Sequence, residues 1–339
     1  MKNPPVVAIV GATGAVGETF LSILHERAFP MAELIVLASE RSAGTQVDFG
    51  NRKLTVRDLA TFDPAGVDIA LFSAGGSVSK QYAPKFAAAG AIVIDNSSAF
   101  RQDADVPLVV SEVNAHALDA IPRGIVANPN CSTMQLLVAL APLHREAKLE
   151  RINIATYQSV SGTGARALEE LGKQTAALLA FQEPRPEVYP VQIAFNVIPH
   201  GGDFLDNGYT TEEMKLVWET RKILGDETIQ VSATSVRVPV FYAHSEAVHI
   251  ETRAKISAAR ARELLEQAPG VEVVDDRAPG GYPTPVTHAS GQDPVYVGRI
   301  REDISHPRGL DLWVVSDNIR KGAALNAIQI AELLLKKYA

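Results

Sequence analysis

The chain has 339 residues, of which 46% are hydrophobic and 21% are charged, and its net charge is −7 at pH 7. This length predicts about two domains. The acidic balance, without any Lys/Arg-rich tract, argues against a nucleic-acid-binding protein. No apolar run is long enough for a membrane span and no secretory signal is recognisable, so we expect a cytoplasmic protein. The single cysteine excludes an intrachain disulfide, and no Cys/His spacing predicts a metal site.

The first hundred residues alternate between short strands and helices. Residues 6–10 form an uninterrupted apolar run, typical of a strand buried on both faces of a parallel sheet. A glycine-rich turn and a helical pattern follow. Such a turn lets backbone N–H groups hold a pyrophosphate, although glycine turns also occur for packing reasons. The pattern predicts a dinucleotide site at Gly11, Thr13, Gly14, Ala15 and Val16.

The next strand, residues 34–38, ends in Ser39-Glu40-Arg41-Ser42. NAD sites usually place an acidic residue here to bind the ribose hydroxyls, whereas an arginine with hydroxyl groups suits a 2′-phosphate. We therefore predict NADP, bound by Ser39, Arg41 and Ser42. Glu40 fits this site less well and is expected to point away. A solvated charged loop is the alternative, and some use of NAD stays open.

Two further strands, residues 68–72 and 91–94, also end in polar turns. The first turn contains Ser73 and Gly75, which we predict to contact the dinucleotide. The second ends at Arg101, which is either a surface ion-pair partner or a ligand for an anionic substrate. Because ligands of open α/β sheets bind at the carboxyl ends of the strands, these turns should converge on one crevice.

The only cysteine lies in Asn128-Pro129-Asn130-Cys131-Ser132-Thr133, between an apolar segment and a strong helical pattern over residues 134–143. This setting places Cys131 in the first turn of a helix, with Asn130 or Ser132 as its cap. Free N–H groups and the helix dipole stabilise a thiolate there. The alternative is a small buried apolar residue.

The second half of the chain has a different order of predicted strands and helices. Strand-like patterns cover residues 151–157, 229–240, 244–254 and 310–317, and helical patterns cover 164–181, 211–224 and 257–267. We predict an α/β protein, with a Rossmann-like domain at 1–130 completed by a C-terminal helix at 318–339. Residues 131–317 should form an α+β substrate and dimerisation domain with a mixed sheet. The Pro/Gly-rich segment 278–283 reads as a loop without an evident function.

Taken in order, these segments resemble the aspartate-semialdehyde dehydrogenase family. The matching elements are GATGAVG, S-x-R-S-x-G, FSAGGS, DNSSAFR, NPNCST, YQSVSG, E-x-x-K, R-x-P-V-x-x-x-H-S-E and VSDNIRKGAALN. The resemblance implies an NADP-dependent enzyme that converts β-aspartyl phosphate to aspartate semialdehyde and phosphate, for lysine, methionine, threonine and diaminopimelate synthesis. It also implies a homodimer or a dimer of dimers. Asn128-Pro129 replaces the Gly-Gly of some branches without disturbing the nucleophile.

Residue roles follow from the same resemblance. Cys131 would form a thioester, His244 would be the general acid/base, and Gln158 would orient the acyl intermediate. The implied substrate-binding residues are Arg237 for the carboxylate, Arg101 and Lys215 for the phosphate, Glu212 for the ammonium group, and Asn130. The implied contacts near the nicotinamide are Ser161, Gly162 and Asn318.

Several alternatives remain at this stage. His200 and His249 could compete with His244 but are read as structural. Lys215 could be an ordinary helix lysine paired with Glu212. At the level of function, the alternatives are N-acetyl-γ-glutamyl-phosphate reductase, which shares the fold and the thioester chemistry, and a non-catalytic homologue. The presence of Cys131, Arg237 and His244 argues against the second alternative.

Overall fold

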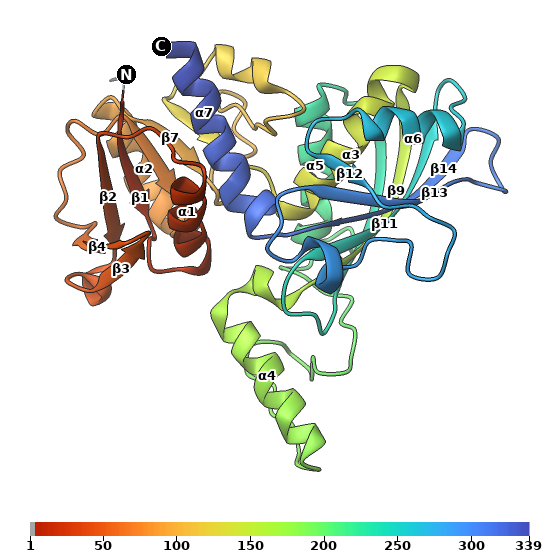
Figure 1. Cartoon of the computed structure of the whole chain (residues 1–339), viewed down its shortest axis with the longest axis horizontal. Coiled ribbons are helices and arrows are strands. Elements are labelled where there is room, and N and C mark those ends of the chain that lie inside the picture. The colour runs from red at the N-terminus through yellow and green to blue at the C-terminus, as the bar shows by residue number, and fades with distance from the viewer. Residues whose placement is uncertain (1–3, 339) are drawn as a thin grey trace. The chain divides into compact units, whose positions relative to one another are not determined.

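The computed structural model describes residues 4–338 (Figure 1). The chain divides into two compact units. The first unit runs to Asn130 and takes up the chain again from Ala323, and the second comprises Cys131–Gly322. Among the described residues, no helix is both long enough and apolar enough to cross a membrane.

The first unit is built on a sheet of six strands in the order β5-β2-β1-β6-β7-β8, in which every pairing is parallel. The strands are β1 (Val6–Val10), β2 (Glu33–Ala38), β5 (Arg57–Asp58), β6 (Ile69–Phe72), β7 (Ile92–Asp95) and β8 (Ile125–Ala127). A hairpin of β3 (Gln46–Phe49) and β4 (Arg52–Thr55) is separate from this sheet. The helices are α1 (Ala15–Glu26), α2 (Gly76–Ala88) and α7 (Asn326–Tyr338). The predicted Rossmann-like fold is confirmed.

Both faces of this sheet are buried, which explains the uninterrupted apolar runs of its strands. On one face, alternate residues such as Ile9 and Leu71 share a core with α1 and α7. On the other face, Phe72 meets Phe86 of α2 edge-on, with 5.3 Å between the ring centroids. Strand order reverses direction between β1 and β6, so a ligand crevice is expected at their carboxyl ends.

The C-terminal helix begins later than the sequence predicts. We predicted a helix from residue 318, but α7 starts at Asn326. The side chain of Asp317 accepts the backbone N–H groups of Ile319 and Arg320, each at 2.8 Å, and so holds the chain in a turn. A wider, π-helical turn follows at Arg320–Leu325. Residue 339, the end of the predicted helix, lies outside the described residues.

Buried amides fasten α7 to the strand ends of the first unit. Asn326 donates to the Asn128 side chain at 2.5 Å and to the carbonyl of Val109 at 2.9 Å. Asn128 in turn donates to the side chain of Asn96 and to the carbonyl of Ala323. This amide ladder fixes the turn that leads into Cys131.

The second unit contains a mixed sheet in the order β10-β9-β11-β14-β13-β12. Its strands are β9 (Leu149–Gln158), β10 (Gln230–Arg237), β11 (His244–Thr252), β12 (Val271–Val273), β13 (Val295–Glu302) and β14 (Gly309–Ser316). Its helices are α3 (Cys131–Ala147), α4 (Ala165–Leu179), α5 (Thr211–Leu224) and α6 (Ala258–Glu266). The predicted mixed sheet is confirmed. The strands β12 and β13, as well as the hairpin in the first unit, were not predicted.

Helices α3, α5 and α6 pack on one face of the mixed sheet. Along β9 that face carries the buried side chains Ile152, Ile154, Thr156 and Gln158. The opposite face carries exposed residues, among them Tyr157, whose ring lies 5.5 Å from that of Trp313. This second face is exposed at Tyr157, but the segment around Ala289 covers it at Tyr296 and Val315.

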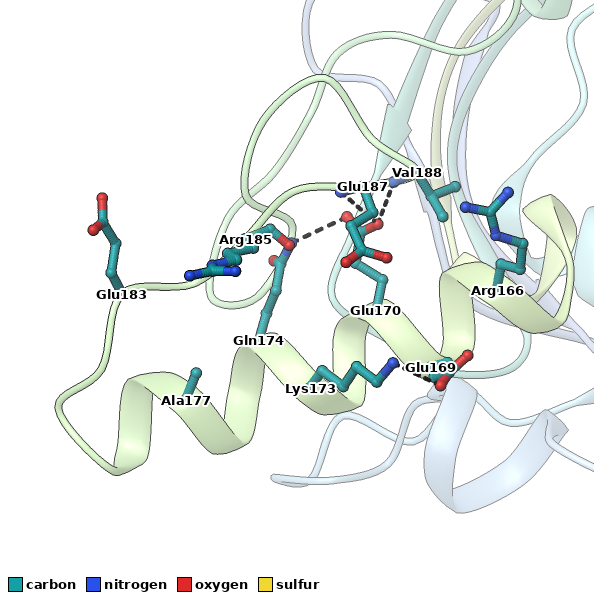
Figure 2. Close-up of a pocket in the computed structure, with 10 residues that line it drawn as sticks. All are labelled: Arg166, Glu169, Glu170, Lys173, Gln174, Ala177, Glu183, Arg185, Glu187 and Val188. Atoms are coloured by element: carbon teal, nitrogen blue, oxygen red, sulfur yellow. Dashed lines mark hydrogen bonds and ion pairs between the residues drawn. The ribbon is translucent and has the colours of Figure 1, made fainter.

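A separate small core holds α4 and the irregular segment after it. Figure 2 shows Glu170 and Gln174 pointing from α4 toward this segment. The Glu170 carboxylate accepts backbone N–H groups from Glu187, Val188 and Tyr189, while Gln174 Oε1 accepts those of residues 193 and 194. Two buried polar side chains thus accept hydrogen bonds from the backbone N–H groups of a loop that has no strand partner.

Candidate active site

A cleft of about 520 Å³ lies at the carboxyl ends of the strands of the first unit. Seven of the predicted cofactor residues line it: Gly11, Thr13, Gly14, Ser39, Arg41, Ser42 and Ser73. Ala15 and Val16 open helix α1 and Gly75 precedes α2, but these three are not among the lining residues. The cleft also includes residues that the sequence reasoning missed, namely Asp58, Leu59, Ala60, Val78, Gln81 and Tyr82.

Glu40 also lines this cleft and is exposed, and the expectation that its carboxylate points away stays a prediction. Glu40 and Arg41, two residues of opposite charge, are thus both lining residues of one cleft. A carboxylate there repels a 2′-phosphate, whereas the guanidinium attracts it. The preference between the two nicotinamide dinucleotides depends on this balance.

Gly11 explains why the turn needs glycine. Its φ is +91°, and a Cβ built on it would lie 2.7 Å from the carbonyl oxygen of Ser73. A side chain would push apart the turns that follow β1 and β6. With glycine, the backbone N–H groups at the start of α1 stay accessible to a phosphate group, so the residues present fit a dinucleotide.

Cys131 is the first residue of α3 and is half-buried. The helix behind it is buried from Ser132 through His144, so its position is fixed by packing on all sides. Gly322 packs directly against the cysteine, because a Cβ at this glycine would lie 2.7 Å from the Cys131 Cβ. The predicted place of the thiol at a helix N-terminus is confirmed.

A chain of polar contacts connects this helix to α5. Gln158, at the end of β9, donates to Ser132 Oγ at 2.9 Å and to Glu212 Oε1 at 3.3 Å. The second oxygen of Glu212 accepts from Lys215 Nζ at 2.7 Å. The ion pair considered for Lys215 is therefore present. It is not a surface pair, since Glu212 is buried and leads to Gln158 and to the residue beside the thiol.

His244, the first residue of β11, is fully buried. Its Nδ1 accepts the backbone N–H of Ser159 at 3.0 Å and lies 3.0 Å from the Ser159 hydroxyl. Burial and then the charge of Arg237 lower the pKa of His244 to about 3. The imidazole is therefore neutral at physiological pH.

Arg237 ends β10 and donates to the carbonyl of Ser159 at 3.1 Å. Gly162 faces both Arg237 and His244, because a Cβ at this glycine would lie 3.0 Å from Arg237 and 3.3 Å from the imidazole Nε2. The structure thus brings the buried residues Ser159 and His244 together with the half-buried Arg237 and the exposed Gly162.

Asn318 and Ser161, implied as nicotinamide contacts, belong to the same group. Asn318 Oδ1 accepts from the hydroxyls of Ser159 and Ser161, each at 3.1 Å, and from the backbone N–H of Ala243 at 3.0 Å. Ser159 was missed in the sequence. The signal that could have found it is a hydroxyl residue directly after the strand that ends in Gln158.

A second buried titratable group lies two residues beyond His244 on the same sheet face. Glu246 is fully buried beside Gln135, which stands one helical turn after Cys131 on α3. Burial raises the pKa of Glu246 well above its ordinary value, and the neighbouring Gln135 opposes this only in part. The carboxyl group is therefore protonated at acidic pH and stays so above its ordinary range.

The remaining predicted substrate residues, Arg101 and Asn130, lie in the first unit. Both are buried, and Arg101 donates to the carbonyl of Asn96 at 2.8 Å. His249 lies 3.0 Å from Asp311 and His200 stacks on Phe204, as their structural reading predicts. Within residues 4–338, no cluster of three His, Cys, Asp or Glu side chains is able to hold a metal ion.

Comparisons with known proteins agree with this architecture. Residues 6–121 match the family model described as semialdehyde dehydrogenase, NAD binding domain. Residues 140–321 match the model described as semialdehyde dehydrogenase, dimerisation domain. The first match falls within the unit that carries the glycine turn, and the second within the unit that carries His244.

Whole-length relatives give the same answer. An aspartate-semialdehyde dehydrogenase of Legionella pneumophila is 59% identical over 334 residues, which are 98% of this chain and 96% of the relative. A crystal structure of aspartate semialdehyde dehydrogenase II from Vibrio cholerae, complexed with ASA, has a TM-score of 0.97 at 54% identity and covers 100% of both chains. A structure of the Candida albicans enzyme with NADP has a TM-score of 0.74 at 25% identity and covers 97% of this chain and 98% of that one. The chain therefore belongs to the aspartate-semialdehyde dehydrogenase family.

Proposed function

We propose that the chain reduces β-aspartyl phosphate with NADPH to L-aspartate 4-semialdehyde and phosphate, through a thioester on Cys131. The observation that supports the proposal is the set of reactive and polar groups in the second unit. A half-buried thiol begins a buried helix, and its unit also holds a buried imidazole, an arginine and an amide linked to an ion pair. These are the groups that covalent reduction of an acyl phosphate requires.

The chemistry proceeds in two steps at the sulfur of Cys131. Its thiolate attacks the acyl carbon, and phosphate leaves with the electrons of the C–O bond. NADPH, when bound, supplies a hydride to the thioester carbon. The resulting thiohemiacetal oxyanion collapses to the aldehyde and expels the thiolate, so that Cys131 returns to its starting state. Gln158, which is fixed by Ser132 and Glu212, is proposed to orient the acyl group.

Substrate recognition is assigned to the charged residues. Arg237 is proposed to bind the carboxylate, because a planar guanidinium can donate two parallel hydrogen bonds. Arg101 and Lys215 are proposed to bind the phosphate, and Glu212 the ammonium group. Asn130, next to the nucleophile in the chain, is proposed to contact the substrate. When the substrate binds, Lys215 would then contact the phosphate and Glu212 the ammonium group, in place of or in addition to the ion pair that they form with each other.

NADP is proposed as the cofactor, held by Ser39, Arg41 and Ser42 at its 2′-phosphate and by the turns beginning at Gly11 and Ser73 at its pyrophosphate. Ser161, Gly162 and Asn318 are proposed for its nicotinamide end. Of the seven cleft-lining residues proposed for this role, three provide hydroxyl or guanidinium groups at the second strand end. A cytoplasmic location remains a prediction from the sequence.

A second copy of this chain is the proposed partner, in a homodimer or a dimer of dimers. The exposed part of the mixed sheet around Tyr157 is the surface proposed for it, since large exposed aromatic side chains on a sheet face are usually covered by a partner. Light scattering in solution tests this, and a particle with the mass of one chain would contradict it.

The activity is tested in the direction that can be followed by absorbance. Purified, reduced protein receives aspartate semialdehyde, NADP⁺ and inorganic phosphate, and formation of NADPH is recorded. Omission of phosphate should limit the signal to one NADPH per active site, because the thioester is then not released as acyl phosphate. N-acetylglutamate semialdehyde serves as the competing substrate. A preference for it would replace the proposed function by the glutamyl reaction, and no turnover with either would favour a non-catalytic homologue.

A further inference from the structure

Asp95, the last residue of β7, has a fully buried carboxylate that contacts two separate segments of the first unit. Its Oδ1 accepts the Ser79 hydroxyl at 2.6 Å and the backbone N–H of Ser97 at 3.1 Å, and its Oδ2 accepts the Ser97 hydroxyl at 2.6 Å. Ser79 belongs to α2, whereas Ser97 lies in the turn 96–101 that follows β7. One buried side chain therefore joins a helix to a turn.

The carboxylate depends on these donors. Among the described residues, they are two hydroxyl groups and one backbone N–H, and no side-chain cation is needed to complete the set. A buried carboxylate is costly without hydrogen bonds, so the loss of one donor leaves an acceptor unsatisfied. The helix and the turn are therefore both held at fixed distances from the end of β7.

The helix contact determines how α2 faces the cofactor cleft. Ser79 is fully buried in the first turn of this helix. Its neighbours Val78, Gln81 and Tyr82 line the cleft at the carboxyl ends of the strands. Because successive residues of a helix point in fixed directions, anchoring Ser79 to Asp95 sets the direction of these three side chains.

The turn contact determines the position of Arg101. The Ser97 hydroxyl donates to Asp95 and accepts the backbone N–H of Ala99 at 3.1 Å, so it holds the turn from both sides. Arg101 is buried at the end of this turn, and its Nη2 donates to the carbonyl of Asn96 at 2.8 Å. The guanidinium therefore rests on a turn whose shape depends on Asp95.

From these contacts we infer that Asp95 is a positioning residue, which orients Arg101 for the substrate phosphate and α2 for the dinucleotide. The inference rests on the proposed function, in which Arg101 binds phosphate and the first unit binds NADP. A binding group that is fixed before its ligand arrives loses less conformational freedom on binding, so the affinity depends on the residues that fix it. Asp95 acts on the two ligands through Ser79 and Ser97.

Two hydroxyl deletions separate the two contacts. Ser97→Ala should raise KM for inorganic phosphate about 3- to 30-fold, the effect of one buried hydrogen bond, and leave the Kd of NADP⁺ within about two-fold. Ser79→Ala should raise the Kd of NADP⁺ about 3- to 30-fold and leave KM for phosphate within about two-fold. KM is measured from NADPH formation at saturating NADP⁺ and aspartate semialdehyde, and Kd from an equilibrium titration.

Asp95→Asn tests the carboxylate itself. The backbone N–H of Ser97 can only donate, so the amide oxygen must take the place of Oδ1 and the NH₂ group the place of Oδ2. The bond from Ser79 then survives, whereas the Ser97 hydroxyl loses its acceptor. Asp95→Asn should therefore resemble Ser97→Ala in raising KM for phosphate more than the Kd of NADP⁺. The opposite order would contradict the inference.

Two control variants distinguish positioning from a general loss of stability. Ser97→Thr keeps the hydroxyl and should return KM for phosphate to within about three-fold of the unmodified value. Ser22→Ala removes a hydroxyl–carboxylate bond of 2.7 Å to Glu26 on the exposed side of α1, and should change neither constant. Thermal denaturation establishes that each variant is folded. Lower melting temperatures without a selective change in KM or Kd would mean that Asp95 is only structural.

The inference is overturned if folded Ser97→Ala binds phosphate as the unmodified protein does, or if both serine variants weaken both ligands equally. Failure of the proposed function would instead appear as absence of phosphate-dependent NADPH formation in the unmodified protein. Calorimetric titrations with NADP⁺ and inorganic phosphate then measure the same two affinities without turnover. The variants must show the same selective pattern there for the role of Asp95 to stand.

Discussion

The cofactor cleft of the first unit is lined by small and polar residues on exposed turns, whereas the thiol of the second unit stands on a helix that is buried along its length. In the first unit, glycines let the backbone approach the ligand. In the second unit, hydrogen bonds through buried residues run from Ser132 to Lys215 and from Arg237 to Asn318, although Lys215 and Arg237 themselves are partly exposed. The two proposed ligands are therefore recognised by different means. The first unit offers exposed backbone N–H groups to the dinucleotide, whereas the second unit offers partly or fully buried charged side chains to the substrate.

Removal of the Cys131 sulfur should abolish turnover in the second unit while leaving NADP binding by the first unit intact. Cys131→Ala is expected to lower turnover by about four orders of magnitude or more, because the covalent route is lost. The affinity for NADP should stay within about two-fold, since the cleft of the first unit contains no part of this helix. Stopped assays and a binding titration measure both. Retained turnover would contradict the thioester route.

Arg237→Lys tests the desolvated charge of the second unit. A lysine keeps the charge but cannot form two parallel hydrogen bonds, so we expect KM for the aldehyde to rise about 30- to 100-fold, equivalent to about 2–3 kcal/mol. Arg260→Lys, at an exposed arginine on α6, is the control and should leave KM unchanged. A KM equal to that of the unmodified protein would remove Arg237 from carboxylate binding.

Arg41→Ala tests the exposed turn of the first unit, where a smaller effect is expected because water screens the charge. Affinity for NADP should fall about 5- to 30-fold, or about 1–2 kcal/mol, while affinity for NAD stays nearly constant. Titrations with both dinucleotides measure this, and Arg57→Ala, outside the cleft, is the control. Equal losses for the two cofactors would mean that another residue holds the 2′-phosphate.

The buried titratable pair of the second unit predicts a pH dependence of stability. His244 has a lowered pKa, so its contribution is present above about pH 6.5 and is lost as pH falls toward 3. Glu246 has a raised pKa, so its contribution is present below about pH 4.5 and is lost as pH rises. Between these two values the contributions oppose each other, and above pH 6.5 only the loss from Glu246 remains.

Glu246→Gln should remove that loss, because the amide is neutral at every pH. The free energy of unfolding of the variant, relative to the unmodified protein, should increase by up to about 1.4 kcal/mol per pH unit above pH 6.5, until the folded-state pKa of Glu246 is passed. Denaturant titrations from pH 5 to 9 measure it, and Glu227→Gln, at an exposed glutamate, is the control. Parallel pH profiles for variant and unmodified protein would show that the carboxyl group is already ionised.

The site of the first unit is easier to predict from the sequence than that of the second, because the first is built from local patterns and the second from contacts between distant residues. The glycine turn, the first strands and the helix start at Cys131 are local patterns, and these were predicted correctly. The group around His244 is not local, since Ser159 and Asn318 are 159 residues apart. No spacing in the chain indicates that they meet, and the contacts of Asn318 with this group were therefore not foreseen.

The predicted bounds of helices and strands were wrong where a side-chain hydrogen bond or a β-bulge overrides the pattern of apolar residues. The C-terminal helix was predicted too early because Asp317 caps the following N–H groups and holds them in a turn. Strand β13 was overlooked because its pairing shifts between Gly298 and Arg301, which breaks the alternation of buried and exposed residues. The cleft residues from Asp58 to Ala60 follow β5, a strand of only two residues that carries no recognisable pattern.

The amide ladder of the first unit has a consequence for the order in which a ribosome can produce an active enzyme. Asn326 joins Val109 and Asn128 across 217 and 198 residues of chain, so the partner of the strand ends is translated only after the whole second unit. The second unit is synthesised in full before this ladder can close. The first unit therefore completes its contacts only after the second unit has been synthesised, and a nascent chain that has not reached Asn326 lacks the contacts that hold the turn into Cys131.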